Sequence, residues 1–135
     1  MIHLIYGRKG SGKSKKLLEM ANKEAETASG NIVYIDDDNR CMYDLKHEVR
    51  FMNTREYGID NADKLYGFVN GILSRDFDIS SIYIDGLKKM VSKDDPQLEK
   101  LLISLDRAFE GISAYMVVSG SGEPPEYLKK YITES

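Results

Sequence analysis

The sequence predicts an α/β fold: a three-layer sandwich in which a mostly parallel, five-stranded sheet carries helices on both faces. Two observations lead to this prediction. Short apolar runs alternate along the chain with longer amphipathic patterns of helical period, as in parallel sheets joined by right-handed helical crossovers. The chain is 135 residues long and shows no internal repeat or linker, which is the length of one domain. We therefore expect residues 1–135 to form a single domain.

Each predicted strand is a short apolar run that ends in a turn-forming residue. Such runs are typical of strands that are buried on both faces. The third run is weaker than the others because it contains Arg50. The five runs are residues 2–6, 32–35, 49–53, 82–84 and 114–118.

Four segments carry apolar residues at helical spacing. A helix is expected from Lys13 to about residue 28, where Ser29 and Gly30 end it, and another over residues 61–73. Gly67 and Gly71 lie one turn apart in the second helix, so we expect it to pack closely on the sheet there. The remaining two helices are predicted to begin at the prolines of Asp94-Asp95-Pro96 and Pro124-Pro125.

Composition and charge exclude several classes of protein. The chain is 41% hydrophobic and 30% charged, with 19 Lys and Arg against 22 Asp and Glu, a net charge of −3. An acidic chain argues against a broad nucleic-acid surface. The single cysteine, Cys41, excludes an internal disulfide and a four-thiolate zinc site. The first apolar run is too short for a signal or membrane segment, so the expected location is the cytoplasm.

The strongest motif lies between the first strand and the first helix. Gly7-Arg8-Lys9-Gly10-Ser11-Gly12-Lys13-Ser14 matches the phosphate-loop (Walker A) pattern G-x4-G-K-[ST]. Glycines let the backbone N–H groups curl around phosphate oxygens, and the following helix directs its positive end at the same point. In this pattern Lys13 reaches the β- and γ-phosphates, where it also serves catalysis, and Ser14 coordinates Mg²⁺. The predicted nucleotide-binding residues are Gly7, Arg8, Lys9, Gly10, Ser11, Gly12, Lys13, Ser14 and Lys15.

Acidic residues follow two of the predicted strands. Asp85 ends the fourth strand and is the candidate carboxylate for the same Mg²⁺, in the manner of a Walker B residue; an ordinary strand-ending turn is the alternative. Asp36, Asp37 and Asp38 follow the second strand. One of them could orient the attacking water, or all three could be solvated turn and capping residues. Strand alternation places Asp37 on the opposite face from Asp38.

The order of these motifs resembles the core of RecA-like ATPases of the phosphate-loop NTPase superfamily. In that family the strand after the first helix ends I-D-x-E, and its Glu activates water. The matching segment here is Ile35-Asp36-Asp37-Asp38, so the resemblance gives Asp38 this catalytic role with a carboxylate one methylene shorter. The resemblance also makes Ser119 a sensor of the nucleotide. Gly86 stands where many motor ATPases have a second acidic residue.

The chain also resembles small stand-alone bacterial phosphate-loop proteins that are sometimes labelled as pilus-retraction (twitching-motility) proteins. True retraction motors are much longer and carry histidine-bearing motifs that are not found in this sequence. We therefore do not transfer that function to this chain.

These features predict a protein that binds ATP or another NTP with Mg²⁺ and acts as a slow ATPase or a nucleotide-dependent switch. A small-molecule or nucleoside kinase is the alternative, and a non-hydrolysing nucleotide-binding scaffold is the second alternative. The six arginines do not cluster in the sequence as a kinase lid requires. Arg40 could face the nucleotide or pair with the neighbouring aspartates. A protein partner is expected, but its identity, the base, the oligomeric state and the source of any arginine finger stay open.

Overall fold

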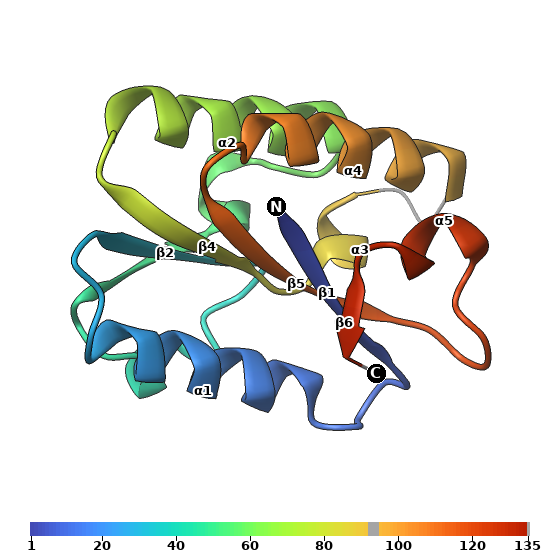
Figure 1. The fold of residues 1–135 in the computed structure, drawn as a ribbon, viewed down its shortest axis with the longest axis horizontal. Helices are drawn as coiled ribbons and strands as arrows, with labels where there is room; N and C mark the ends of the chain where they lie inside the picture. Colours follow the sequence, from blue (N-terminus) through green and yellow to red (C-terminus); the bar gives the residue numbers. More distant parts are fainter. Residues whose placement is uncertain (92–94, 135) are drawn as a thin grey trace.

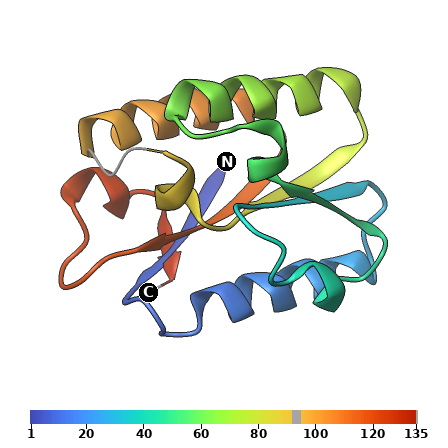
Figure 2. The same cartoon turned by 180° about the vertical axis from the view of Figure 1, so that it is seen from behind.

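The computed structural model describes residues 1–91 and 95–134 and has the predicted α/β architecture. One sheet runs through the molecule, with α1 on one face and α2 and α4 on the other (Figures 1 and 2). The strand order is β3-β2-β4-β5-β1-β6, and every pair is parallel. The predicted three-layer sandwich is therefore confirmed.

The elements follow the predicted order closely. The strands are β1 (Ile2–Gly7), β2 (Asn31–Asp36), β3 (Val49–Asn53), β4 (Ile79–Ile84), β5 (Ser113–Ser119) and β6 (Ile132–Glu134). The helices are α1 (Lys13–Ala25), α2 (Ala62–Arg75), α3 (Leu87–Met90), α4 (Asp95–Ala108) and α5 (Glu126–Lys129), with two 3₁₀ turns, η1 (Met42–Asp44) and η2 (Thr54–Tyr57). The expected helix start at Asp94 lies outside the described residues. None of the helices in the described part of the chain has the length and apolar character that crossing a membrane requires.

Two details correct the prediction. A sixth strand, β6, pairs with β1 at the edge of the sheet; with only three residues it has no pattern to predict it from. Gly67 and Gly71 lie on the exposed side of α2, and an added Cβ would meet no atom within 4 Å at either position. Close packing on the sheet therefore does not explain these glycines, and nothing else in the structure does.

The sheet buries a hydrophobic core on each face. The larger core lies beneath α2 and α4 and includes Leu65, Val69, Leu98 and Leu105, which are fully buried. The smaller core lies beneath α1, which packs through residues such as Leu17. Because one 13-residue helix faces most of the sheet on this side, the strands supply large side chains of their own.

These large side chains form an aromatic row on the α1 face, defined as Phe51, Tyr34, Tyr83, Tyr115 and His3 from β3, β2, β4, β5 and β1. Adjacent members are paired in the strand register. Their rings stack with centroids 4.9–6.4 Å apart. The row crosses five neighbouring strands, and therefore fixes their register.

Candidate functional site

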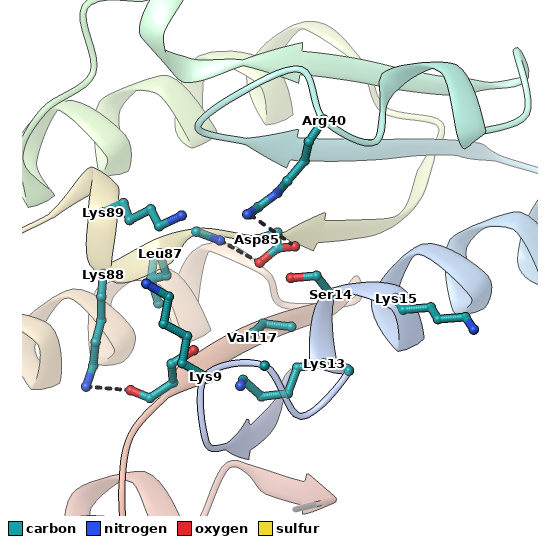
Figure 3. Close-up of a pocket in the computed structure, with 14 residues that line it drawn as sticks. Lys9, Lys13, Ser14, Lys15, Arg40, Asp85, Leu87, Lys88, Lys89 and Val117 are labelled. Atoms are coloured by element: carbon teal, nitrogen blue, oxygen red, sulfur yellow. Dashed lines mark hydrogen bonds and ion pairs between the residues drawn. The ribbon is translucent and has the colours of Figure 1, made fainter.

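A cleft of about 690 Å³ opens at the carboxyl ends of the central strands, where parallel sheets bind ligands. Its volume is within the usual range for small-molecule sites. Side chains from the loop before α1, from the end of β4, from α3 and from the segment after β2 enter it (Figure 3). The lining residues are Lys9, Gly10, Gly12, Lys13, Ser14, Lys15, Arg40, Asp85, Gly86, Leu87, Lys88, Lys89, Val117 and Ser119.

The loop between β1 and α1 has the backbone geometry that the motif predicts. Gly10 and Gly12 have φ of +84° and +87°, a region that favours glycine. The helix begins directly afterwards at Lys13, with no side-chain cap and no acidic residue in its first turn. The positive end of α1 therefore has no counter-charge in its own first turn, which suits an anion in the cleft.

Lys13 is buried within this loop. Its side chain is only 7% exposed, and Nζ donates to the carbonyl of Arg8 and to Ser11 Oγ at 3.4 Å. Burial lowers the pKa of the Lys13 ammonium, and the nearby Asp85 carboxylate partly opposes this effect. An anion bound in the cleft would favour the charged ammonium and so offset the effect of burial on its pKa.

The predicted phosphate-loop residues divide into two groups. Lys9, Gly10, Gly12, Lys13, Ser14 and Lys15 line the cleft. Gly7, Arg8 and Ser11 are absent from its lining and support the loop instead: Arg8 and Ser11 accept from Lys13, and the Gly7 carbonyl accepts from Gly120 N at 3.0 Å.

Asp85 and Ser14 line the same cleft although 71 positions separate them in the sequence. Asp85 is 3% exposed, and its backbone N donates to Ile35 O at 2.8 Å, which extends the β2–β4 ladder by one residue. Its Oδ1 accepts from Gly86 N at 2.7 Å, and its Oδ2 lies 3.7 Å from Arg40 Nη2. A buried carboxylate facing a hydroxyl is a donor set that suits Mg²⁺. If the metal binds here, Ser14 and Asp85 are the residues that would hold it.

The run Asp36–Asp38 does not form the solvated turn that is one of its two sequence interpretations. Asp36 and Asp37 are 0% and 3% exposed, so they are not solvated turn residues. Oxygens of the three side chains all lie within 4.8 Å of one another, so Asp37 and Asp38 are not on opposite faces. The physical reason is that β2 ends at Asp36, and the alternation of side chains ends with the strand.

The charge on the Asp36 carboxylate is costly. Burial raises the pKa of Asp36 to about 7; the neighbouring Asp37 and Asp85 act in the same direction, and Arg40 opposes them. Neither carboxylate oxygen of Asp37 has a hydrogen-bond partner among the described residues. Asp37 does lie 3.7 Å from Arg55 Nη2 and 3.8 Å from Arg40 Nη2.

Gly86 makes room for this arrangement. Its φ is +71°, and a Cβ at this position would collide with the Asp37 carboxylate. A larger residue at position 86 would therefore displace Asp37. This contact gives a structural reason for glycine at the position where the resembled motor ATPases carry a second acidic residue.

Asp38 contacts Arg40 and does not line the cleft. Its Oδ1 accepts from the backbone N of Arg40 at 3.0 Å and lies 3.4 Å from Arg40 Nε. The side chain is 34% exposed. Asp38 therefore approaches the cleft only through its contacts with Arg40.

Three cationic residues, Arg40, Lys88 and Lys89, line the cleft in addition to the lysines of the predicted phosphate loop. Arg40 pairs with the aspartates, as one of its two sequence interpretations predicts, and it also lines the cleft. Lys88 and Lys89 were not expected; Lys88 Nζ donates to the carbonyl of Ser119 at 3.0 Å and thereby joins α3 to the end of β5 (Figure 3). Two consecutive lysines after Asp85-Gly86-Leu87 are the sequence signal that could have found them.

No protein-family model matches the chain, and a comparison with curated protein sequences finds no significant match. The fold itself, a parallel sheet with helices on both faces, is compatible with a RecA-like phosphate-loop core. The functional argument therefore depends on the site.

Proposed function

We propose that this protein binds a nucleoside triphosphate, with ATP as the first candidate, together with Mg²⁺, and that it acts as a slow ATPase or nucleotide-dependent switch of RecA-like type. The observation that carries the proposal is the convergence of two sequence motifs on one cleft. The loop before α1 brings Lys13 and Ser14, and the end of β4 brings Asp85 to the same space.

Each group of cleft residues has a separate role in the proposed function. The N–H groups at the start of α1 and the Lys13 ammonium bind and neutralise the β- and γ-phosphates. Ser14 and Asp85 hold Mg²⁺, which supplies further neutralisation of the phosphate charge. Lys9, Lys15 and Lys89 add positive potential around the opening, which attracts a polyanion to a chain whose net charge is −3.

Slow hydrolysis is favoured over fast hydrolysis by the position of Asp38. A water-activating carboxylate must come within hydrogen-bond reach of the attacking water. Here Asp38 accepts from Arg40 and does not line the cleft. The same observation supports a switch whose catalytic group comes from a protein partner.

A panel of nucleotides tested by thermal shift, with and without Mg²⁺, examines the proposal. A ligand at 100 times its dissociation constant adds about 2.7 kcal/mol to the free energy of unfolding. No stabilisation by any nucleotide contradicts the proposal. Product analysis then separates the alternatives: phosphate release without an acceptor indicates a hydrolase, ADP formation only with an acceptor indicates a kinase, and binding without turnover indicates a scaffold or switch.

The role of Asp38 has its own test. If Asp38 activates the water, Asp38→Asn should lower hydrolysis by about 10²- to 10⁴-fold, the contribution of a general base, and leave nucleotide binding nearly unchanged. Asp37 is unsuitable as the silent control because it is buried against Gly86. The exposed Asp44 in the same connection is the matched control, and equal rates in Asp38→Asn and Asp44→Asn would remove Asp38 from the catalytic machinery.

A further inference from the structure

Arg40 occupies a distinctive place in the cleft. It follows β2, and its side chain, 43% exposed, extends toward Asp85 beside Ser14 (Figure 3). The segment that carries Arg40 is therefore a different one from the segments that carry the phosphate loop and the proposed Mg²⁺ ligands. The side chain reaches the cleft from the side of β2, whereas Lys13 comes from the loop after β1.

The guanidinium of Arg40 is shared among four carboxylates. Its Nη2 lies 3.4 Å from Asp36 Oδ1, 3.8 Å from Asp37 Oδ1 and 3.7 Å from Asp85 Oδ2. Its Nε lies 3.4 Å from Asp38 Oδ1. All four separations exceed the 2.7–2.9 Å that is usual for a charge-assisted hydrogen bond. Arg40 is therefore held by the summed charge of the cluster and not by one tight pair.

Arg40 and a metal ion compete for the same carboxylate. Mg²⁺ binds carboxylate oxygens at about 2.0–2.1 Å, and Asp85 Oδ1 already accepts from Gly86 N, so Oδ2 is the oxygen that faces Arg40. A divalent cation on Asp85 repels a guanidinium beside it. The backbone of Arg40 stays fixed by Asp38, which accepts from its N–H, while the half-exposed side chain is able to turn.

We propose that Arg40 selects the triphosphate: it neutralises Asp85 in the unliganded protein, leaves that carboxylate when Mg²⁺ binds, and then contacts the terminal phosphate of the nucleotide. This inference rests on the proposed function. The guanidinium matches phosphate oxygens in a two-point geometry that an ammonium does not offer. A diphosphate lacks the terminal group, so Arg40 contributes to the binding of ATP and not to that of ADP.

The experiment compares the parent protein, Arg40→Ala and a control, Arg55→Ala. Arg55 also pairs with Asp37, at 3.7 Å, but it is 72% exposed and does not line the cleft. Two quantities are measured by calorimetry: the affinity for Mn²⁺ without nucleotide, and the ratio of affinities for a non-hydrolysable ATP analogue and for ADP, both with Mg²⁺. Arg40→Lys is included because it keeps a cation among the carboxylates if Arg40→Ala does not fold.

Arg40→Ala should bind Mn²⁺ at least about threefold more tightly, because its competitor is gone, and should lower the ATP-analogue to ADP ratio at least about tenfold. Arg40→Lys should lower the ratio by a smaller factor, and Arg55→Ala should change neither quantity. An unchanged ratio in both Arg40 variants overturns the inference while the proposed function stands. A parent protein that binds neither nucleotide overturns the proposed function, and the inference with it.

Discussion

Two neighbouring rows of side chains on the α1 face of the sheet serve opposite purposes. The aromatic row crosses the middle of the strands. Two residues further along β3, β2 and β4, on the same face, lie Asn53, Asp36 and Asp85, which we name the polar row. Tyr34 precedes Asp36, and Tyr83 precedes Asp85, by the same two-residue step.

The rows differ in the charge that they bury. In the aromatic row the Tyr83 hydroxyl donates to Glu24 Oε1 at 2.5 Å, and Ser81 donates to the other oxygen of that carboxylate at 2.6 Å. In the polar row Asp36 and Asp85 are buried around one shared guanidinium. Poorly compensated buried charge is characteristic of functional sites. On the proposed function, the aromatic row stabilises the fold and the polar row, two residues further along the strands, binds the ligand.

The largest expected effect comes from removing the lysine at the end of the loop between β1 and α1. Lys13→Ala should weaken triphosphate binding by about 2–3 kcal/mol, or roughly 30- to 150-fold, because a charged hydrogen-bond donor to the phosphates is lost. Titration calorimetry measures this change. Lys23→Ala, at the other end of α1, is the control and should bind like the parent. Equal affinities in the two variants would disprove the phosphate-loop assignment.

A hydroxyl deletion in the aromatic row should change stability and not binding. Tyr83→Phe should lower the free energy of unfolding by about 1.5–3 kcal/mol, the value of a hydrogen bond to a charged group. Tyr34 is the matched control, because its buried hydroxyl has no hydrogen-bond partner among the described residues. Tyr34→Phe should leave stability unchanged or raise it by about 1 kcal/mol. Urea denaturation measures both free energies of unfolding. An equal loss of stability in the two variants would show that the hydrogen bond of Tyr83 to Glu24 does not stabilise the fold.

The polar row should make stability depend on pH. The pKa of Asp36 is about 7 in the folded protein, above its ordinary value of 3.8. Between these values the folded state binds the extra proton, so this group's contribution to stability is complete at low pH and is lost as pH rises through 7. Asp36→Asn removes this loss, so its advantage over the parent in the free energy of unfolding should be about 2–3 kcal/mol larger at pH 8 than at pH 5. Urea denaturation in EDTA at both pH values is the measurement, and a pH-independent difference would show that Asp36 does not carry the proton.

The smallest effect is expected outside both rows. Gly67→Ala and Gly71→Ala should each stabilise the protein by about 0.5–1 kcal/mol. Both glycines lie in the middle of α2 on its exposed side, and an added methyl group meets open space. Thermal melting measures the gain, and nucleotide affinity should not change. A loss of stability in either variant would mean that this face of α2 is covered in solution.

The sequence was sufficient for the architecture and for the local motifs. Apolar runs located five strands, and glycine spacing located the loop before α1, because these signals are local. The contacts around Arg40 could not be predicted in the same way. They depend on the end of β2 lying beside the end of β4, and on Gly86 leaving space for Asp37. The burial of Lys13 and Asp36 likewise follows from the packing of distant segments, and not from their neighbours in the sequence.

On the proposed function the polar row and the phosphate loop bind one metal–nucleotide complex, so the affinity for ATP should depend on Mg²⁺ through Asp85. The parent, Asp85→Asn and Asp78→Asn are titrated with ATP by calorimetry, with Mg²⁺ and with EDTA; Asp78 is an exposed residue before the opposite end of β4. Mg²⁺ should tighten ATP binding at least about tenfold in the parent and in Asp78→Asn, because carboxylate coordination of the metal links it to the nucleotide. In Asp85→Asn this gain should be largely lost, while the affinity in EDTA stays close to that of the parent. An identical response to Mg²⁺ in all three proteins would show that Asp85 is a structural strand-end residue and would contradict the account.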